Sequence, residues 1–577
     1  MKVLLLHPED AFAEWRATQH CDLVVDLGRA TTGIYEGWSR QTGCPVISIY
    51  DYAEETEDLY YLRELLQLGN GRVIDQWGID WWDVFSLEIA SKVQRAILVH
   101  RLAKELPKSC DLYFSHADPV ADALQRLLGA QLIYFGGLQL SRRRLRRYYQ
   151  ALSRLGKAEF FQLIEDKFDL DHSIRRRFAV RRKRNGQPVV LLPSAYANVS
   201  RAALSYAALV PEQQFMLVVA RRNGYEATPP RNVLVEPLTS YFGATDKREL
   251  ASLLKSWDSL TARLINRAPE FKTAELEGNP GSTGAPFRWG IALRDAWLRF
   301  YACEHVTACL SADDSNPITR LPLILAKKLR IPTLACHHGA LDFRMAIKAN
   351  HADIYLAKSE MELDYLRRIC NVASEKVVLA APASSKPLPL RREARRSAPW
   401  LVFFTEPYQS YGWRSDEVYR DLLPCLCSLA QSCGLRLVFK LHPFESIKIH
   451  RRMLRRLISG HEREIEVLAG PPSDQLWNNT RLALTVQSST ALECAALGIP
   501  VFLCAWLRDL YSGYVQQYAR FREAHILESS EEIAKIPTLL ESENGESEPR
   551  AARRAINSGE FAQLLSGTYS LPVASNA

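Results

Sequence analysis

The segment LALTVQSSTALECAALGIPVF at positions 482–502 predicts a buried strand, a polar turn, a short helix ending at Gly498 and a second strand beginning at Pro500. The segment LRLVFKLHPFES at positions 435–446 likewise passes from an apolar run into polar residues. Strands that alternate with helices in this way are typical of a parallel sheet covered by helices on both faces. Ligands bind beyond the carboxyl ends of the strands in such sheets, which is where the polar residues of both segments fall.

The same alternation extends outward over the chain in three series. The first series predicts strands at 3–7, 23–27, 45–50, 111–115 and 131–135, with helices at 86–106 and 119–128. The second predicts strands at 189–193, 215–220, 306–312, 332–337 and 353–357, and a long surface loop at 268–286 where Gly, Pro and Thr accumulate. The third predicts strands at 400–405, 435–441, 465–468, 482–486 and 500–504.

These series predict a chain of several domains. We expect an N-terminal Rossmann-like unit at 1–140, a basic helical connector at 141–187, a second Rossmann-like unit at 188–385, a linker at 386–399, a C-terminal nucleotide-binding unit at 400–565 and a flexible tail at 566–577.

The composition is that of an ordinary globular protein. Of the 577 residues, 47% are hydrophobic and 24% are charged, which excludes a fibrous or largely disordered chain. Polar residues interrupt the most apolar long window, 482–507, so we expect no membrane span. The apolar run at 3–6 is too short for a signal peptide, and we expect a cytoplasmic protein. The 12 cysteines form no CxxC pair, which favours buried thiols over disulfides or zinc sites.

The formal net charge of +8 is unevenly distributed. Two Arg-rich runs, 142–147 and 175–184, together carry more positive charge than the whole surplus, so the remainder of the chain is slightly acidic. Such clusters can be solvated helix or linker surface, or they can bind an anionic membrane. No aromatic or zinc-finger pattern accompanies them, so we expect no nucleic acid partner.

The third series holds the sharpest candidate site. Lys440, His442 and Pro443 follow directly after a predicted strand. Ser488, Ser489 and Thr490 open the short helix, where hydroxyl groups can cap the helix or, with the free N–H groups, hold a phosphate.

Glu493, one turn into the same helix, stands among small apolar residues. A carboxylate in such surroundings is costly to bury without a hydrogen-bond donor, and a ribose diol would supply one.

The pair KLHP and QSSTALECAALGIPVF resembles the HP and SS/ST motifs of bacterial GT-B glycosyltransferases, which include capsule sialyltransferases and Kdo transferases. It is also similar to the related CDP-glycerol-type polymer transferases of wall teichoic acid synthesis. The resemblance covers positions 400–510 well and the rest only in general architecture. It implies a GT-B-like α/β fold of two or three Rossmann-like parallel-sheet domains, with a nucleotide cleft between the last two. It also implies that His442, Ser488 and Ser489, with Thr490 adjacent, contact the donor phosphates and that Glu493 binds ribose.

The second series supplies candidates for the acceptor side. Asp313 and Asp314 follow a predicted strand, where they can cap the next helix or face the cleft. His338-Gly339 follows another strand and resembles a His-Gly of the teichoic-type transferases.

A base that deprotonates the acceptor hydroxyl is commonly Asp, Glu or His. We rank His338 first, because an unperturbed histidine titrates near neutral pH, then Asp313, then Asp26 in the loosely matching VVDLGRA.

The predicted function is transfer of a sugar from a nucleotide-activated donor to a cell-surface polysaccharide or glycolipid. The alternatives are a CDP-alditol phosphotransferase of polymer synthesis and a non-catalytic sugar-nucleotide-binding protein. We expect no cofactor and no metal, since no DxD follows a strand and the helix dipole with Lys440 can neutralise the leaving phosphate.

Overall fold

The structure of the chain is a computed structural model. It describes residues 1–8, 10, 21–114, 119–134, 186–220, 228–243, 246–276, 284–339, 341, 343–382, 392–408, 412–443, 445–458, 465–508, 514–542 and 555–568. Both Arg-rich runs and most of the predicted connector and tail lie outside these residues. None of the helices in the described part of the chain has an apolar stretch sufficient to cross a bilayer.

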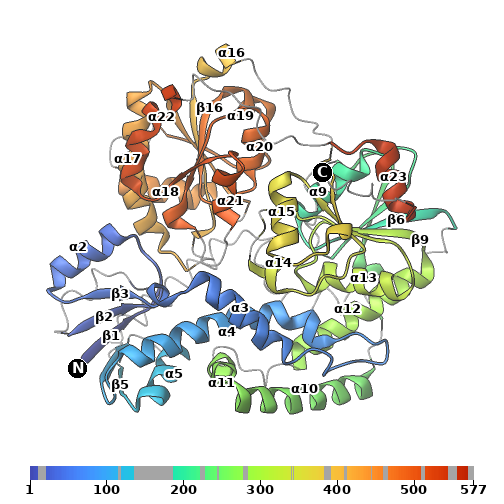
Figure 1. Cartoon of the computed structure of the whole chain (residues 1–577), viewed down its shortest axis with the longest axis horizontal. Coiled ribbons are helices and arrows are strands. Elements are labelled where there is room, and N and C mark those ends of the chain that lie inside the picture. The colour runs from blue at the N-terminus through green and yellow to red at the C-terminus, as the bar shows by residue number, and fades with distance from the viewer. Residues whose placement is uncertain are drawn as a thin grey trace, which may run out of the picture.

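Three parallel sheets form the framework (Figure 1). The first has the order β3-β2-β1-β4-β5, with strands β1 Lys2–Leu6, β2 Leu23–Asp26, β3 Val46–Ser48, β4 Asp111–Phe114 and β5 Gln131–Tyr134. The second has the order β12-β11-β10-β9-β6-β7-β8, with strands β6 Pro188–Ser194, β7 Phe215–Val219, β8 Val233–Pro237, β9 His305–Ser311, β10 Thr333–Ala335, β11 Ile354–Ala357 and β12 Val377–Leu379. The third has the order β15-β14-β13-β16-β17-β18, with strands β13 Trp400–Phe404, β14 Arg436–Lys440, β15 Glu466–Leu468, β16 Thr480–Thr485, β17 Val501–Cys504 and β18 His525–Leu527.

Helices connect these strands and cover the sheets. With the first sheet come α2 Thr32–Thr42, α3 Glu55–Gln67, α4 Trp81–Glu105 and α5 Pro119–Leu128. With the second come α9 Ala197–Ala207, α10 Lys247–Arg267, α11 Pro269–Leu276, α12 Gly284–Cys303, α13 Pro317–Lys328, α14 Phe343–Ile347 and α15 Glu360–Arg368. The rest of the chain forms α16 Arg392–Arg396, α17 Ser415–Ser432, α18 Ile447–Leu457, α19 Asp474–Asn479, α20 Thr490–Ala496, α21 Tyr514–Arg520, α22 Ile536–Ser542 and α23 Ser558–Ser566.

The predicted fold class, α/β with Rossmann-like parallel sheets, is confirmed, and the sheets number three. Every strand predicted from an apolar run is present to within a few residues, whereas β8, β12 and β18 were not predicted.

The predicted surface loop at 268–286 is wrong in part, because α11 occupies Pro269–Leu276. Phe271 and Ala274 bury one side of α11 in the core that it shares with α4, and this burial stabilises a helix in a Pro- and Thr-rich sequence.

Helix α4 joins the first sheet to the second. It is apolar around much of its surface, and its aromatic residues pack against helices of the second unit. The Trp82 and Trp257 ring centroids lie 5.5 Å apart, and those of Phe85 and Phe287 lie 5.3 Å apart. The first half of α4 therefore belongs to the core of the second unit, whereas its later residues Leu98, Val99 and Leu102 pack in the core of the first sheet.

The last helix, α23, packs on the second sheet although it follows the third in sequence (Figure 1). Its Phe561 is fully buried, and the preceding Ile556 N–H donates to Ala381 O at 3.0 Å. After the third sheet, the chain returns to the second unit. The C-terminal unit predicted at 400–565 therefore includes a helix, α23, that packs in the second unit.

A buried ion pair links the first sheet to the third. The Arg414 guanidinium, at the start of α17, donates to both carboxylate oxygens of Asp26 at 2.6 and 2.9 Å. It also donates to the carbonyl oxygens of His7, Pro8 and Asp10. This one side chain therefore pairs a buried carboxylate and fixes the loop that follows β1.

We predict that Arg414→Ala lowers the stability of the protein by roughly 3–5 kcal/mol, because it leaves the fully buried Asp26 carboxylate without its cation. Chemical denaturation followed by intrinsic fluorescence measures the effect. Arg420→Ala is the matched control, since Arg420 is 54% exposed and pairs with Glu417 at the surface of the same helix; we expect a loss within about 1 kcal/mol. Equal losses for the two variants would contradict the structural role of Arg414.

Candidate functional site

Asp313 lies just beyond the carboxyl end of β9, and its carboxylate is the centre of a hydrogen-bond network. It accepts from Ser315 N at 2.8 Å, from Asn316 Nδ2 at 2.9 Å and from the Tyr196 hydroxyl at 2.8 Å. The capping of α13 falls to Asn316, with Pro317 as the first helical residue. Asp313 is therefore free from the capping role that the sequence left open.

Tyr196, just after β6, bridges Asp313 and His338. Its hydroxyl oxygen lies 3.2 Å from His338 Nε2. Because a tyrosine hydroxyl has one hydrogen and donates it to Asp313, the network assigns the histidine proton to Nε2. Nδ1 then carries the lone pair, and this buried atom has no hydrogen-bond partner among the described residues.

The surroundings set the charges of this pair. Burial lowers the pKa of His338 to about 3, His337 adds to the shift, and Asp313 opposes it. This corrects the expectation of an ordinary histidine pKa: His338 is neutral at physiological pH. Burial alone would raise the pKa of Asp313, but the two histidines and the hydrogen bonds from Ser315 hold it below its usual value.

Asp313, His337 and His338 form the set that could hold a metal ion in the described part of the chain, with ligand atoms within 4.8 Å of one another. The Asp313 carboxylate, however, already accepts from three neighbouring side chains and one backbone N–H. Lys358 and Arg344 lie close enough to disfavour a positive charge on His338. Saturated oxygens and nearby cations make this cluster a poor cation site.

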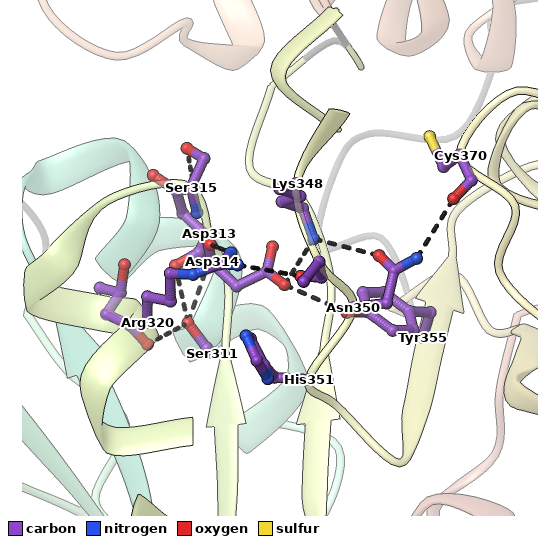
Figure 2. Close-up of polar contacts among 12 residues, drawn as sticks. Ser311, Asp313, Asp314, Ser315, Arg320, Lys348, Asn350, His351, Tyr355 and Cys370 are labelled. Carbon is purple, nitrogen blue, oxygen red and sulfur yellow. Dashed lines mark hydrogen bonds and ion pairs between the residues drawn. The ribbon is translucent and has the colours of Figure 1, made fainter. Parts of the chain in front are cut away.

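The neighbouring Asp314 points into the protein and is structural. Figure 2 shows the Lys348 ammonium between Asp314, at 2.6 Å, and Asn350, which reaches the Cys370 carbonyl. Tyr355 also donates to Asp314 at 3.2 Å. Asp313 and Asp314 therefore have opposite roles, although they are adjacent in sequence.

Asp26, the third candidate base, lies elsewhere, at the carboxyl end of β2. Beside its two bonds from Arg414, it accepts from Gly28 N at 2.8 Å and from the Tyr35 hydroxyl at 2.9 Å. Because four donors already bind its two oxygens, Asp26 is a poor acceptor for a substrate proton.

On the third sheet, His442 begins a tight turn after β14. Its N–H donates to Thr405 Oγ1 at 3.0 Å and to Glu445 Oε2 at 3.1 Å, which fixes the loop. Burial, with a contribution from Lys440, lowers the pKa of His442 to about 4. Lys440 itself is buried and donates to the carbonyls of Leu441 and Gly470, so it braces the edge of the sheet.

The hydroxyl run stands beyond β16, at the start of α20. Ser488 Oγ accepts from Thr490 N at 3.3 Å and from Thr490 Oγ1 at 2.9 Å, whereas Ser489 makes no side-chain cap bond. Glu493 is half-buried in the first turn. At the other end Gly498 has φ +68, which favours glycine, and it turns the chain toward β17.

Sequence reasoning missed Glu406, which follows β13 between the ends of β14 and β16. It is 4% exposed, and Oε1 has no partner among the described residues. Burial raises the pKa of Glu406 to about 8. A hydrogen bond from the Gln487 backbone opposes this rise, and the charge of Glu445 adds to it. The available signal in the sequence was an acidic residue close after the apolar run at 400–404.

The two sheet edges are joined through α21, which packs on α15. The Tyr518 hydroxyl lies 3.5 Å from Ser488 O. The ring centroids of Tyr518 and Tyr514 lie 5.4 Å apart, and those of Tyr514 and Tyr365 lie 5.1 Å apart. On the side of the second sheet, Lys358 donates to Gly339 O at 3.3 Å, next to His338. Helix α21 therefore links the Ser488 edge of the third sheet to α15 of the second unit.

No family model matches the sequence, and no curated protein matches it. Solved structures resemble the chain in fold. The wall teichoic acid polymerase TagF is 12% identical, with 75% of this chain and 92% of that chain covered and a TM-score of 0.33. The UDP-GlcNAc 2-epimerase from Neisseria meningitidis is 11% identical, with 66% and 99% covered and a TM-score of 0.37. The calicheamicin glycosyltransferase CalG4 is 10% identical, with 67% and 94% covered and a TM-score of 0.35. Likenesses this distant do not say what this chain does.

We predict that Glu406→Gln stabilises the protein increasingly as the pH rises from 5 to about 8. An unfolded glutamate loses its proton near pH 4.3, whereas folded Glu406 holds it to about pH 8, so the folded state binds more protons in this range and wild-type stability falls with pH. Melting temperatures measured across this pH range should diverge between variant and wild type. Glu375→Gln, at an exposed position, is the control and should show no such divergence. A constant difference for Glu406→Gln would contradict a protonated Glu406.

Proposed function

We propose that this chain is a nucleotide-sugar-dependent glycosyltransferase that transfers a sugar to a polysaccharide or glycolipid acceptor. One observation carries the proposal: two adjoining parallel sheets present different chemistry at their carboxyl ends. The edge with Asp313, Tyr196 and His338 supplies a proton acceptor, and the edge with His442 and the hydroxyl run supplies hydrogen-bond donors. Ligand sites of open parallel sheets lie at such edges.

The donor lies at the third sheet in this proposal. Ser488, Ser489 and Thr490 offer hydroxyl and backbone donors to its phosphates, and the neutral His442 contacts the same group. Glu493 accepts from the ribose hydroxyls. Glu406, protonated below about pH 8, can donate where an ionised carboxylate would repel a phosphate.

The acceptor lies at the second sheet. Its hydroxyl oxygen attacks the sugar carbon bonded to the donor phosphate, the bond to the phosphate oxygen breaks, and His338 Nδ1 takes the hydroxyl proton. Tyr196 holds the imidazole with Nε2 protonated, and Asp313 stabilises the positive charge that develops. Asp313 therefore acts through Tyr196, as a positioning residue. No step requires a metal ion, and full turnover in the presence of EDTA is the expected result.

A screen of donors tests the proposal. Purified protein is incubated with CMP-, UDP-, GDP- and CDP-linked sugars and with glycan or glycolipid acceptors, and the release of nucleotide is measured. Release with transfer of sugar supports the proposal. Transfer of an alditol phosphate from a CDP-linked donor would replace it with phosphotransfer, and binding without turnover would indicate a sugar-nucleotide-binding protein.

We predict that His442→Ala weakens the binding of the active nucleotide without unfolding the protein. Ser488→Ala combined with Ser489→Ala should cost more affinity for the nucleotide than for its nucleoside, by roughly 1.5–3 kcal/mol for each lost bond to phosphate. Calorimetric titration measures both. His305→Ala, at an exposed position at the amino end of β9, is the control and should bind normally. Equal losses for nucleoside and nucleotide would indicate a damaged helix start instead.

We predict that His338→Ala keeps donor affinity and loses roughly 10²–10⁴-fold in turnover, the usual effect of removing a general base. Tyr196→Phe should lose less, because the imidazole remains but its tautomer is no longer held. Donor affinity, melting temperature and turnover are measured on the same preparations. A His338 variant that folds normally and turns over at the wild-type rate would exclude His338 as the base.

A further inference from the structure

Helix α18, Ile447–Leu457, has one apolar face and one strongly basic face. Its sequence is IKIHRRMLRRL, and His450, Met453 and Leu454 are buried in the core of the third unit. The His450 ring lies 4.9 Å from that of Tyr419 on α17, so the buried face is firmly packed. The helix lies against α17 and β15 (Figure 1).

The other face of α18 carries five cations, all exposed: Lys448, Arg451, Arg452, Arg455 and Arg456. Their spacing of three and four residues places them on the same side of the helix. The helix contains no acidic residue, and of these five side chains Arg456 pairs with Asp416 of α17. Like charges at this spacing destabilise a helix, so the array is maintained against an electrostatic cost.

An ordinary solvated helix of the same protein has a different pattern. The exposed side of α10 carries Lys247, Arg248, Lys255, Arg263 and Arg267 together with Asp258, and Asp246 caps its start. These acids offset part of the positive charge of α10, whereas α18 has no acid of its own. A single-sign array of this density attracts a surface of opposite charge.

An apolar side chain lies among these cations. Ile449 is 44% exposed, although it precedes the buried His450. Exposed aliphatic carbon gains nothing from a phosphate backbone in water, but it gains from entering the boundary between lipid headgroups and acyl chains. Cations beside an exposed aliphatic residue favour an anionic bilayer over a nucleic acid as the partner.

We propose that the basic face of α18 is a docking surface for anionic lipid membranes. Lys448, Arg451, Arg452 and Arg455 contact the headgroups, and Ile449 enters the interfacial region. Because α18 begins five residues after His442 in the chain, docking places the His442 edge of the third sheet beside the membrane. This inference goes beyond the proposed function and does not depend on it.

The test compares two variants of the full chain that lose the same number of charges. The first carries Lys448→Gln, Arg451→Gln, Arg452→Gln and Arg455→Gln. The control carries Lys247→Gln, Lys255→Gln, Arg263→Gln and Arg267→Gln on α10. Glutamine has nearly the helix propensity of lysine and arginine, and none of these side chains is buried, so neither variant should melt below the wild type.

Co-sedimentation with phosphatidylcholine vesicles, with and without phosphatidylglycerol, measures docking. Near an anionic surface each cation contributes about fivefold in affinity, so the α18 variant should lose at least tenfold and the α10 control much less. Wild-type binding should also weaken steeply as salt shortens the screening length to about 8 Å at physiological ionic strength. Equal binding by the two variants would overturn the proposal, because the docking would then belong to other cations of the chain.

Ile449→Ser distinguishes a bilayer from any other polyanion. This variant should bind anionic vesicles severalfold more weakly and should bind a polyphosphate matrix as the wild type does. If vesicle binding is unchanged while the α18 charge variant loses binding to polyphosphate, the surface recognises a soluble polyanion and the membrane proposal fails.

Discussion

The arrangement of the units depends on the pairing of buried charges, above all on that of Arg320 with Asp83. Arg320 lies in α13 with no exposed surface, and its guanidinium donates to Asp83 of α4 at 2.6 Å. A second group, His351 Nε2, lies 2.6 Å from the other oxygen of the same carboxylate. An unpaired buried cation would be strongly destabilising, and Asp83 of α4 supplies the acid that pairs with Arg320 where α13 packs on the second sheet. This ion pair therefore ties the N-terminal unit to the second unit.

The same pairing determines the form of the candidate site. Arg320 also donates to the carbonyl oxygen of Asp314, and Lys348 neutralises the Asp314 carboxylate. Because these contacts hold Asp314 inside the protein, Asp313 is the acid of the pair that binds Tyr196, and Tyr196 in turn contacts His338. The third sheet is arranged similarly, because Lys440 binds two carbonyls behind the edge and leaves the hydroxyl run and His442 in front. In both sheets, a buried cation therefore holds a loop of the candidate site in place. In the second sheet, Arg320 holds the loop that carries Asp313, the acidic partner of His338. In the third sheet, Lys440 holds the loop that carries His442.

Much of the fold could be predicted from sequence, because a buried parallel strand is a short apolar run and its end is marked by polar residues. The runs that end before Asp313, His337 and His442 are of this kind, and the strands β9, β10 and β14 are present there. Strands such as β8 were missed because edge position leaves them partly exposed, as at Leu234, and weakens the pattern. Helix α11 was missed because its stability comes from packing against α4 rather than from its own residues.

The sequence by itself determined which residues stand at strand ends, since that depends on local patterns of a few residues. Only the tertiary structure decided the partners of those residues. Asp26 binds Arg414, which is 388 positions away in the chain, and Asp313 meets Tyr196 across 117 positions. The protonation of Glu406 and His338 likewise follows from burial by distant segments. Contacts between residues this far apart in sequence, and burial by distant segments, depend on how whole units pack. A local pattern of residues therefore cannot predict them.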